Sequence, residues 1–275
     1  MTVVDAHHHL WDLSVRDQDW IPEGSPIRRD FTVDDLTAEV TAAGVDRTVL
    51  VQTVTVAEET PEFLALADGH DLIAGVVGWT DLTRPDVADE LARLRELPGG
   101  HLLKGIRHQV QGEPDPQWLL RPDVRRGLTA VADAGLVYDL VVLARQLPAC
   151  VEAAGALPGL TFVLDHLGKP PIASGRPEPW ARAVRALAAH PNTVCKLSGL
   201  VTEADPAGWT VEDLRPYADV VLDAFGPDRL MYGSDWPVCR LAGTTYGETL
   251  DIAREVAGEE DPRIFGGTAV RVYGL

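Results

Sequence analysis

Short apolar runs rich in β-branched residues alternate with helical patterns along the whole chain, and this alternation limits the possible folds more than any other feature. The predicted strands cover Val3–Leu10, Arg47–Thr55, Leu72–Trp79, Leu102–Gln109, Leu136–Leu143, Leu160–His166, Thr193–Leu200 and Arg229–Ser234. The predicted helices cover Asp34–Ala43, Pro61–Gly69, Asp86–Leu97, Asp123–Ala134, Arg145–Ala154, Pro179–Ala189, Val211–Ala224 and Tyr246–Ala257. This α/β pattern of strand–helix units predicts a (β/α)8 TIM barrel that forms a single domain over residues 1–275. A doubly wound open sheet is the alternative, although no GxGxxG motif follows the first run.

The composition argues against several classes of function. A formal net charge of −18 disfavours binding to nucleic acid or to an anionic membrane, because both need basic patches. No apolar run reaches about 18 residues and no signal-like leader precedes the first strand, so we expect neither a membrane span nor a secretory signal. Three separated cysteines without a CxxC pair fit the reducing cytoplasm, the expected location, and argue against a thiolate zinc site.

The first predicted strand ends in three consecutive histidines. Because side chains alternate along a strand, His7 and His9 should share one face and His8 the other. Two imidazoles on one face at the end of a strand can share a metal ion or one substrate oxygen. Asp5 should lie one alternation deeper on the same face, where we expect it to orient a histidine.

Polar residues also gather at the ends of later strands. In a TIM barrel the carboxyl ends of all eight strands meet at one face, so we expect His166 and Asp235 to join His7 and His9 there. Three histidines and an aspartate could hold one metal ion, with Asp235 accepting a proton from water. Without a metal, the histidines could polarise a carbonyl directly. Two plainer interpretations stay open: His166 ties down the following loop, and Asp235 caps a turn.

Other residues at these strand ends are candidates for substrate binding: Arg107, His108, Trp79, Trp20 and Lys196. Arg107 could instead be structural, and Lys196 could form an ion pair with Asp139 or Asp165. The long segment Asp12–Asp30 follows the first strand and is either a lid or an irregular surface connection. A small-molecule substrate is the expected partner, and a homodimer is left open.

Several motifs together resemble the amidohydrolase superfamily, in its amidohydrolase-related (amidohydrolase 2) branch. They are the segments 5–11 (DAHHHLW), 75–82 (GVVGWTDL), 105–108 (GIRH), 165–170 (DHLGKP), 196–200 (KLSGL), 232–237 (YGSDWP) and 265–273 (FGGTAVRVY). The chain looks most like the lactonases of that branch, which include L-fuconolactonase, L-rhamnonolactonase and 2-pyrone-4,6-dicarboxylate lactonase. The resemblance spans essentially the whole chain, and its HxH and GSDWP motifs are specific for the branch and weak for the substrate.

The resemblance implies a barrel hydrolase in which Asp235 activates water and His7, His9 and His166 complete a central quartet that would also hold a metal ion. Zinc is the expected metal, manganese is the second choice, and metal-independent catalysis stays open. The bridging residue of binuclear relatives has no clear equivalent, since Lys104 and Asp139 stand in the corresponding strands. We therefore expect at most one metal ion.

The resulting hypothesis is a lactonase that opens a sugar-acid lactone in carbohydrate catabolism. Water attacks the carbonyl, Asp235 takes the proton, and the histidines stabilise the oxyanion with or without one divalent metal ion. One alternative is the non-oxidative decarboxylation of an aromatic or unsaturated carboxylic acid. A second is a non-catalytic barrel that binds a metal or ligand.

Overall fold

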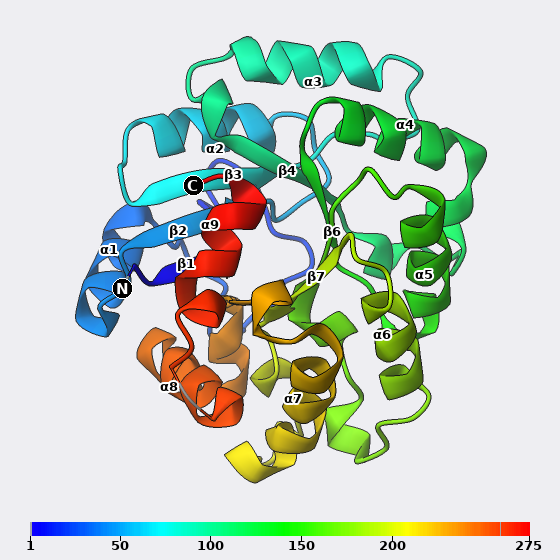
Figure 1. The fold of residues 1–275 in the computed structure, drawn as a ribbon. Coiled ribbons are helices and arrows are strands. Elements are labelled where there is room, and N and C mark those ends of the chain that lie inside the picture. Colours follow the sequence, from blue (N-terminus) through cyan, green and yellow to red (C-terminus); the bar gives the residue numbers. More distant parts are fainter. Residues whose placement is uncertain (1, 259) are drawn as a thin grey trace.

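Eight parallel strands form one sheet in sequential order, and helices surround it (Figure 1). The computed structural model describes residues 2–258 and 260–275. The strands are β1 Val4–His8, β2 Arg47–Val51, β3 Ile73–Gly78, β4 Leu103–His108, β5 Val137–Leu140, β6 Phe162–Leu164, β7 Thr193–Leu197 and β8 Leu230–Tyr232. A parallel bridge between His8 and Trp236 connects the last strand region to the first. The structure is the predicted (β/α)8 barrel.

A helix follows each strand, as the hydrophobic pattern predicts. The helices are α1 Val33–Ala43, α2 Glu59–Asp68, α3 Val87–Glu96, α4 Pro122–Asp133, α5 Leu147–Ala156, α6 Trp180–Ala188, α7 Val211–Phe225, α8 Tyr246–Ala257 and an unpredicted α9, Thr268–Tyr273. The strands are shorter than predicted, because their last polar residues belong to the loops that follow. Within the described residues, no helix is long and apolar enough to cross a bilayer.

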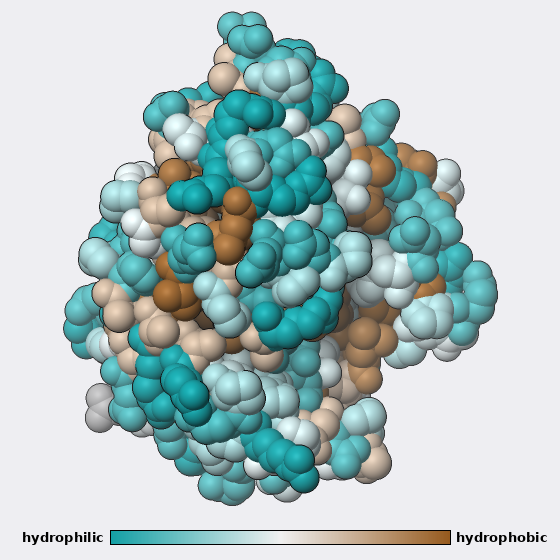
Figure 2. All heavy atoms as spheres, turned by 90° about the vertical axis from the view of Figure 1, so that its right-hand side faces the viewer, coloured by the Kyte–Doolittle hydropathy of each residue, from teal (hydrophilic) through white to brown (hydrophobic). Residues whose placement is uncertain are grey.

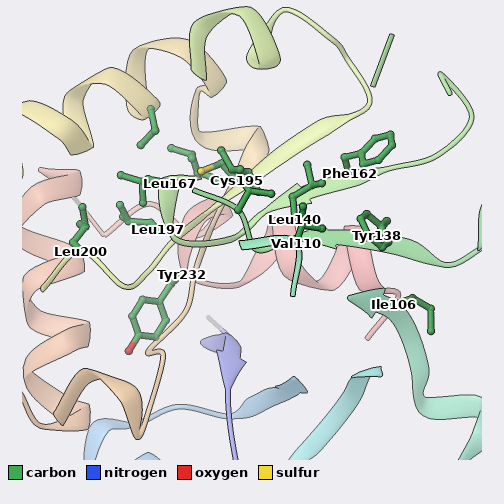
Figure 3. Packing of buried hydrophobic residues seen from close by; sticks show 14 of the residues in the cluster. Ile106, Val110, Tyr138, Leu140, Phe162, Leu167, Cys195, Leu197, Leu200 and Tyr232 are labelled. Atoms are coloured by element: carbon green, nitrogen blue, oxygen red, sulfur yellow. The ribbon is translucent and has the colours of Figure 1, made fainter. Parts of the chain in front are cut away.

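Two apolar layers hold these elements together. Ile106, Tyr138, Leu140, Phe162 and Cys195 point outward from their strands into the layer beneath the helices (Figure 3). A smaller cluster fills the barrel interior: Val4, Ala6, Val49, Val51, Val77, Val137, Val163, Val194 and Met231, with Ala269 and Tyr273 of α9. In Figure 1, α9 lies in front of the strands, so this helix closes the amino-terminal end of the barrel. The opposite end is left for a site.

The outer face of the barrel on the side of α4, α5 and α6 is mainly hydrophilic. Figure 2 shows mainly hydrophilic residues there, with apolar ones in scattered patches. Isolated apolar residues are normal on a protein surface and need no partner. This face fits the strongly acidic composition.

Strand β1 departs from strict alternation, and this changes the expected position of Asp5. The pairing register between β1 and β2 shifts between Asp5 and His8. Ala6 points into the barrel interior, while Asp5 points outward and accepts a hydrogen bond from the Tyr246 hydroxyl of α8 at 3.0 Å. The prediction that Asp5 shares the face of His7 is wrong, because an irregularity intervenes. Asp5 instead accepts bonds from the backbone N–H groups of His7 and Ser234 at 3.0 and 2.8 Å.

Candidate active site

Four side chains converge at the carboxyl end of the barrel. His7 and His9 come from the end of β1, His166 follows β6, and Asp235 follows β8. The Nε2 atoms of His7 and His9 are 3.2 Å apart. Asp235 Oδ1 lies 3.6 Å from Nε2 of His9 and 3.8 Å from Nε2 of both His7 and His166. The structure thus brings together the four residues that the sequence placed at the strand ends, and His8 points away to Thr48 at 2.9 Å.

The backbone at two of these positions is strained. His166 and Asp235 both have positive φ values, 51° and 53°, which side chains with a Cβ atom rarely adopt. His166 begins a left-handed turn that continues through Lys169. Such conformations persist only where the surrounding structure enforces them, and they cluster at functional sites. The strain is consistent with side chains that are held in place for a reaction.

A glycine makes room for the His166 ring. Gly199 follows β7 with a φ of 61°, and a Cβ atom there would lie 2.7–2.9 Å from His166 side-chain atoms. Gly233 has a similar role beneath His7, whose Cβ atom would lie 2.7 Å from an added methyl group. Contacts this short do not occur between real side chains, so both positions require glycine.

The hydrogen bond at Nδ1 of each imidazole determines whether its Nε2 atom presents a lone pair or an N–H group to the site. Nδ1 of His9 lies 2.8 Å from the backbone oxygen of Val51, so it carries the hydrogen and leaves an Nε2 lone pair facing the site. Nδ1 of His166 lies 2.8 Å from the hydroxyl of Ser198, which can donate or accept. His166 can therefore present either a lone pair or an N–H to the site.

A buried charge network surrounds His7. Lys196 Nζ lies 2.6 Å from Asp139, 3.0 Å from Asp165 and 3.1 Å from Nδ1 of His7. Burial lowers the pKa of His7 well below its usual value, and the neighbouring Lys196 charge lowers it further. The ion pair that the sequence left open for Lys196 is present with both carboxylates. Since Lys196 is fully buried, the structure places it beneath the pocket and not on its wall.

Arg107 lies between this network and the open pocket. Its Nη1 atom donates to Asp165 at 3.0 Å and lies 3.3 Å from Nε2 of His7. Its Nε and Nη2 atoms donate to the side-chain oxygen of Gln52 at 3.0 and 2.8 Å. The guanidinium is therefore fixed in orientation, with one edge in the pocket. The contribution of Gln52 was missed by the sequence analysis, since it lies just beyond the end of β2 in an unremarkable apolar run.

Burial shifts the pKa values of His166 and Asp235 in opposite directions. Burial lowers the pKa of His166 to about 4, so its imidazole is neutral at pH 7. For Asp235, burial raises the pKa, but the charge of His166 and a hydrogen bond with His9 lower it more, and the net shift is downward. At neutral pH the site therefore holds the Asp235 carboxylate beside the neutral imidazole of His166, and an ionised carboxylate can accept a proton.

His9, His166 and Asp235 line a pocket of about 290 Å³, and His7 is buried next to them. The pocket walls come from several strand-end loops: His9, Trp20, Thr53, Arg107, Gln109, Gln111, Val141, His166, Lys169, Thr202, Glu203, Asp235, Val238 and Leu241. This size suits a small molecule rather than a polymer. The polar wall residues Gln109, Gln111, Thr202 and Glu203 were not among the predicted site residues. Gln109 and Gln111 directly follow the GIRH segment, and their position after β4 was the available signal.

Besides the buried Lys196, two further predicted substrate-binding residues, His108 and Trp79, lie outside this pocket. His108 stacks on Trp118 with ring centroids 4.2 Å apart, and its Nδ1 atom accepts a hydrogen bond from Trp79 at 3.0 Å. Trp79 lines a separate hollow beside Asp81 and Arg84. Among the predicted candidates, only Arg107 and Trp20 line the pocket with the quartet. His108 follows Arg107 directly, so strand alternation turns it to the other face.

The segment 12–30 is anchored at both its base and its middle. Trp11 and Phe31 form an antiparallel bridge, and Trp11 Nε1 donates to the backbone oxygen of Arg29 at 2.7 Å. Arg16 pairs with Glu62 of α2 through bonds of 2.7 and 3.1 Å. These contacts hold the segment against the barrel and bring Trp20 to the pocket. Whether the segment also opens as a lid stays a prediction.

The imidazole and carboxylate groups of the site are of the kinds that bind a single divalent metal ion. In a tetrahedral site with bonds of about 2.0–2.1 Å, neighbouring ligand atoms lie roughly 3.3–3.4 Å apart. Nε2 of His7 and Nε2 of His9 lie 3.2 Å apart, and Asp235 Oδ1 lies 3.6–3.8 Å from Nε2 of His7, His9 and His166. His7, His9 and Asp235 form a group whose candidate ligand atoms all lie within 4.8 Å of one another, and His166 belongs to a second such group, with His7 and Asp165. The Nδ1 atoms of His9 and His166 are hydrogen-bonded to Val51 and Ser198, which fixes the orientation of both rings. Metal-binding histidines are commonly oriented by such a hydrogen bond on the nitrogen that does not bind the metal.

Comparisons with known proteins agree with this geometry. A family model described as Amidohydrolase matches residues 4–275. An L-fucono-1,5-lactonase of Burkholderia ambifaria is 40% identical over 99% of this chain and 95% of its own length. A second L-fucono-1,5-lactonase, from Burkholderia multivorans, is 39% identical over 99% of this chain and 96% of its own. The chain therefore belongs to the amidohydrolase family.

Solved structures give the same result. A crystal structure of an amidohydrolase from Burkholderia multivorans with bound HEPES is 37% identical, covers 100% of both chains and has a TM-score of 0.92. A crystal structure of an amidohydrolase from the same species with bound zinc has a TM-score of 0.91 over the same full coverage. The predicted family, barrel fold and enzyme class, a lactonase-type hydrolase, are confirmed.

Proposed function

We propose that this enzyme hydrolyses the 1,5-lactone of L-fuconate, or an aldonolactone of closely similar shape, to the free sugar acid. The observation that carries the proposal is the Asp235 carboxylate, which lies within 3.8 Å of three imidazole nitrogens at the floor of a small pocket. The two L-fucono-1,5-lactonases at about 40% identity support the choice of substrate. The three buried free cysteines support the proposal that the enzyme works in the reducing cytoplasm.

The proposed reaction begins with a water molecule held by Asp235. The carboxylate takes a proton as the water oxygen attacks the lactone carbonyl carbon, and a tetrahedral oxyanion forms. The ring C–O bond then breaks, and the proton held by Asp235 passes to the leaving alkoxide, either directly or through His166, which gives its own N–H proton and receives the one from Asp235. The product is the open-chain hydroxy acid, and no other reactant is consumed.

The oxyanion needs hydrogen-bond donors or a cation, and the hydrogen-bond partners limit which residues serve. His9 presents a lone pair, because its Nδ1–H faces the Val51 carbonyl. The chain's own donors are therefore Arg107 Nη1 and the Nε2–H form of His166. A zinc ion held by His7, His9, His166 and Asp235 would, when bound, polarise the carbonyl and lower the pKa of water.

Acid release in weak buffer tests the proposal directly. We expect rapid enzyme-dependent acidification with L-fucono-1,5-lactone, and slower or no acidification with L-rhamnono-, L-arabinono- and D-galactonolactone. Asp235→Asn should lower kcat by roughly 10²–10⁴-fold, the range for losing a general acid–base group. Asp251→Asn, an exposed substitution on α8, is the matched control and should leave kcat unchanged.

Three results would contradict the proposal or a part of it. No acid release from any aldonolactone, with or without added zinc or manganese, would exclude the substrate class. Carbon dioxide release from an aromatic or unsaturated carboxylic acid would support the alternative decarboxylase. A folded Asp235→Asn protein with near-normal turnover would remove Asp235 from the mechanism and leave the substrate class intact.

A further inference from the structure

The pocket above the quartet has two chemically different sides. One side carries amide, hydroxyl and charged groups from the loops after β4, β6 and β7. The other carries three apolar side chains: Trp20, Val238 and Leu241. Val141 is an apolar residue on the first side. The two sides offer different partners to the two ends of one small substrate.

The apolar side lies next to Asp235. Val238 and Leu241 belong to a 3-10 helix, Val238–Ala242, that begins three residues after Asp235. Their spacing of three places them on one face of this helix, since a 3-10 helix has about three residues per turn. The backbone N–H of Cys239 donates to the backbone carbonyl oxygen of Asp235 at 3.0 Å and fixes this helix to the site. The apolar side chains Val238 and Leu241 therefore line the same pocket as Asp235 and follow it closely in the chain.

Trp20 extends this apolar side of the pocket without adding a polar group. Its Nε1 atom donates to the side-chain oxygen of Gln18 at 2.9 Å, so the indole N–H is already satisfied within the loop. Its ring packs edge-on against Trp11 with centroids 5.7 Å apart, which fixes its orientation. The ring is 38% exposed and Leu241 is 45% exposed. In the described residues only Val15 joins them as a large exposed hydrophobic side chain.

The polar side suits hydroxyl groups. Lys169 and Glu203 form an ion pair of 3.2 Å at the pocket wall, where each keeps capacity for a further hydrogen bond. The amide nitrogen of Gln109 donates to the Thr53 carbonyl, which leaves its oxygen free to accept. Together with Gln111 these groups offer both donors and acceptors to a polyhydroxylated ring.

We infer that the apolar wall formed by Trp20, Val238 and Leu241 contacts the exocyclic carbon of the lactone and favours substrates with a methyl group there over substrates with a hydroxymethyl group. Trp20, Val238 and Leu241 are then specificity-determining residues, and the sugar hydroxyls face Gln109, Lys169 and Glu203. This inference rests on the proposed function. A hydroxyl group placed against the wall would lose its water without gaining a partner, since none of the three side chains offers one there.

Two lactones that differ in one atom test the inference. L-Fucono-1,5-lactone carries a methyl group where L-galactono-1,5-lactone carries a hydroxymethyl group, and their ring hydroxyls have the same configuration. We expect the wild-type enzyme to prefer the deoxy substrate on the order of 10–100-fold in kcat/KM, the range that an apolar pocket achieves against an added hydroxyl. Acid release from freshly prepared lactones provides the rates.

The variants place a polar group in the wall at nearly constant shape. Val238→Thr and Leu241→Gln should each lower the preference several-fold, mainly by raising kcat/KM for the hydroxymethyl substrate. Val15→Thr is the matched control, because Val15 lines a separate hollow with Phe63 and Leu66. It should leave the preference unchanged.

The possible failures are distinguishable. Hydrolysis of neither lactone would contradict the proposed function. Hydrolysis of both with equal kcat/KM would leave that function standing and overturn this inference. Variants that lower both rates equally would show that the wall only packs against the ring, which also overturns it.

Discussion

Replacing the buried Lys196 is the most stringent test of the charge network beneath the site. Its ammonium group has no exposed surface and lies within 3.1 Å of Asp139, Asp165 and His7. Lys196→Met keeps the length of the aliphatic chain and removes the charge. The two carboxylates would then be buried with less compensation, from Arg107 and the Tyr273 hydroxyl.

Removing one partner of a buried ion pair costs about 3–5 kcal/mol, because an uncompensated charge is left behind. For a domain of this size each kcal/mol corresponds to about 2–4 °C in Tm, so we expect Tm to fall by roughly 6–20 °C. The free energy of unfolding, measured by urea denaturation, should fall by the same energy. Catalytic activity should fall as well, since Nδ1 of His7 loses a neighbour.

The pH dependence of this loss has a definite sign. Burial raises the pKa of Asp139 to about 6, and the Lys196 charge opposes that shift. Without Lys196 the folded-state pKa rises further above the ordinary value of 3.8. A raised folded-state pKa gives stability that is lost as pH rises through it. Lys196→Met should therefore be destabilised more at pH 8 than at pH 5.

Lys104→Met is the control, because Lys104 is partly exposed and its ammonium donates to the Gly274 backbone oxygen at 3.2 Å. A surface contact of this kind is worth less than about 1 kcal/mol. Equal Tm values for the wild type and Lys196→Met, with a normal Lys104→Met, would refute the account of the buried network.

Three further predictions concern the site itself. Gly199→Ala should lower kcat/KM on the order of 100-fold, because the added methyl group displaces the His166 ring. The control Gly44→Ala has a similar φ of 70° and no atom within 4 Å of the added methyl group, so its kcat/KM should not change. Equal kcat/KM for the two variants would show that Gly199 is not needed to position His166. The kcat/KM profile should be flat from about pH 5 to 8 and fall near pH 4 and below, where His166 and then Asp235 become protonated; an acid limb near pH 6.5 would show that His166 has an ordinary pKa. One zinc ion should bind per chain in equilibrium dialysis, and His9→Ala should weaken binding by at least 10-fold; unchanged stoichiometry and affinity would place the ion elsewhere.

Local pattern was sufficient for the architecture. All eight predicted strands and all eight predicted helices occur, because the hydrophobic period of a segment depends only on neighbouring residues. The short helix α9 was not predicted. It lies against the interior residues of several strands, and those contacts are absent from its own six-residue pattern.

The quartet could be predicted because the barrel topology brings every carboxyl strand end to one face. His7, His9, His166 and Asp235 each follow directly from that rule. The directions of individual side chains beyond the strand ends could not be predicted. Trp79 turns away from the pocket and donates a hydrogen bond to His108, which stacks on Trp118, while Gln111 and Glu203 turn toward the pocket.

The sequence by itself determined the barrel, the family and the four residues at its centre, since each depends on residue type, spacing and the order of strands. Only the tertiary structure decided the face of Asp5, the partners of Lys196 and the composition of the pocket walls. An irregularity in β1 reverses the face of Asp5, and long-range contacts place Lys196 between two carboxylates. Such contacts join residues more than 30 positions apart, and no local period encodes them.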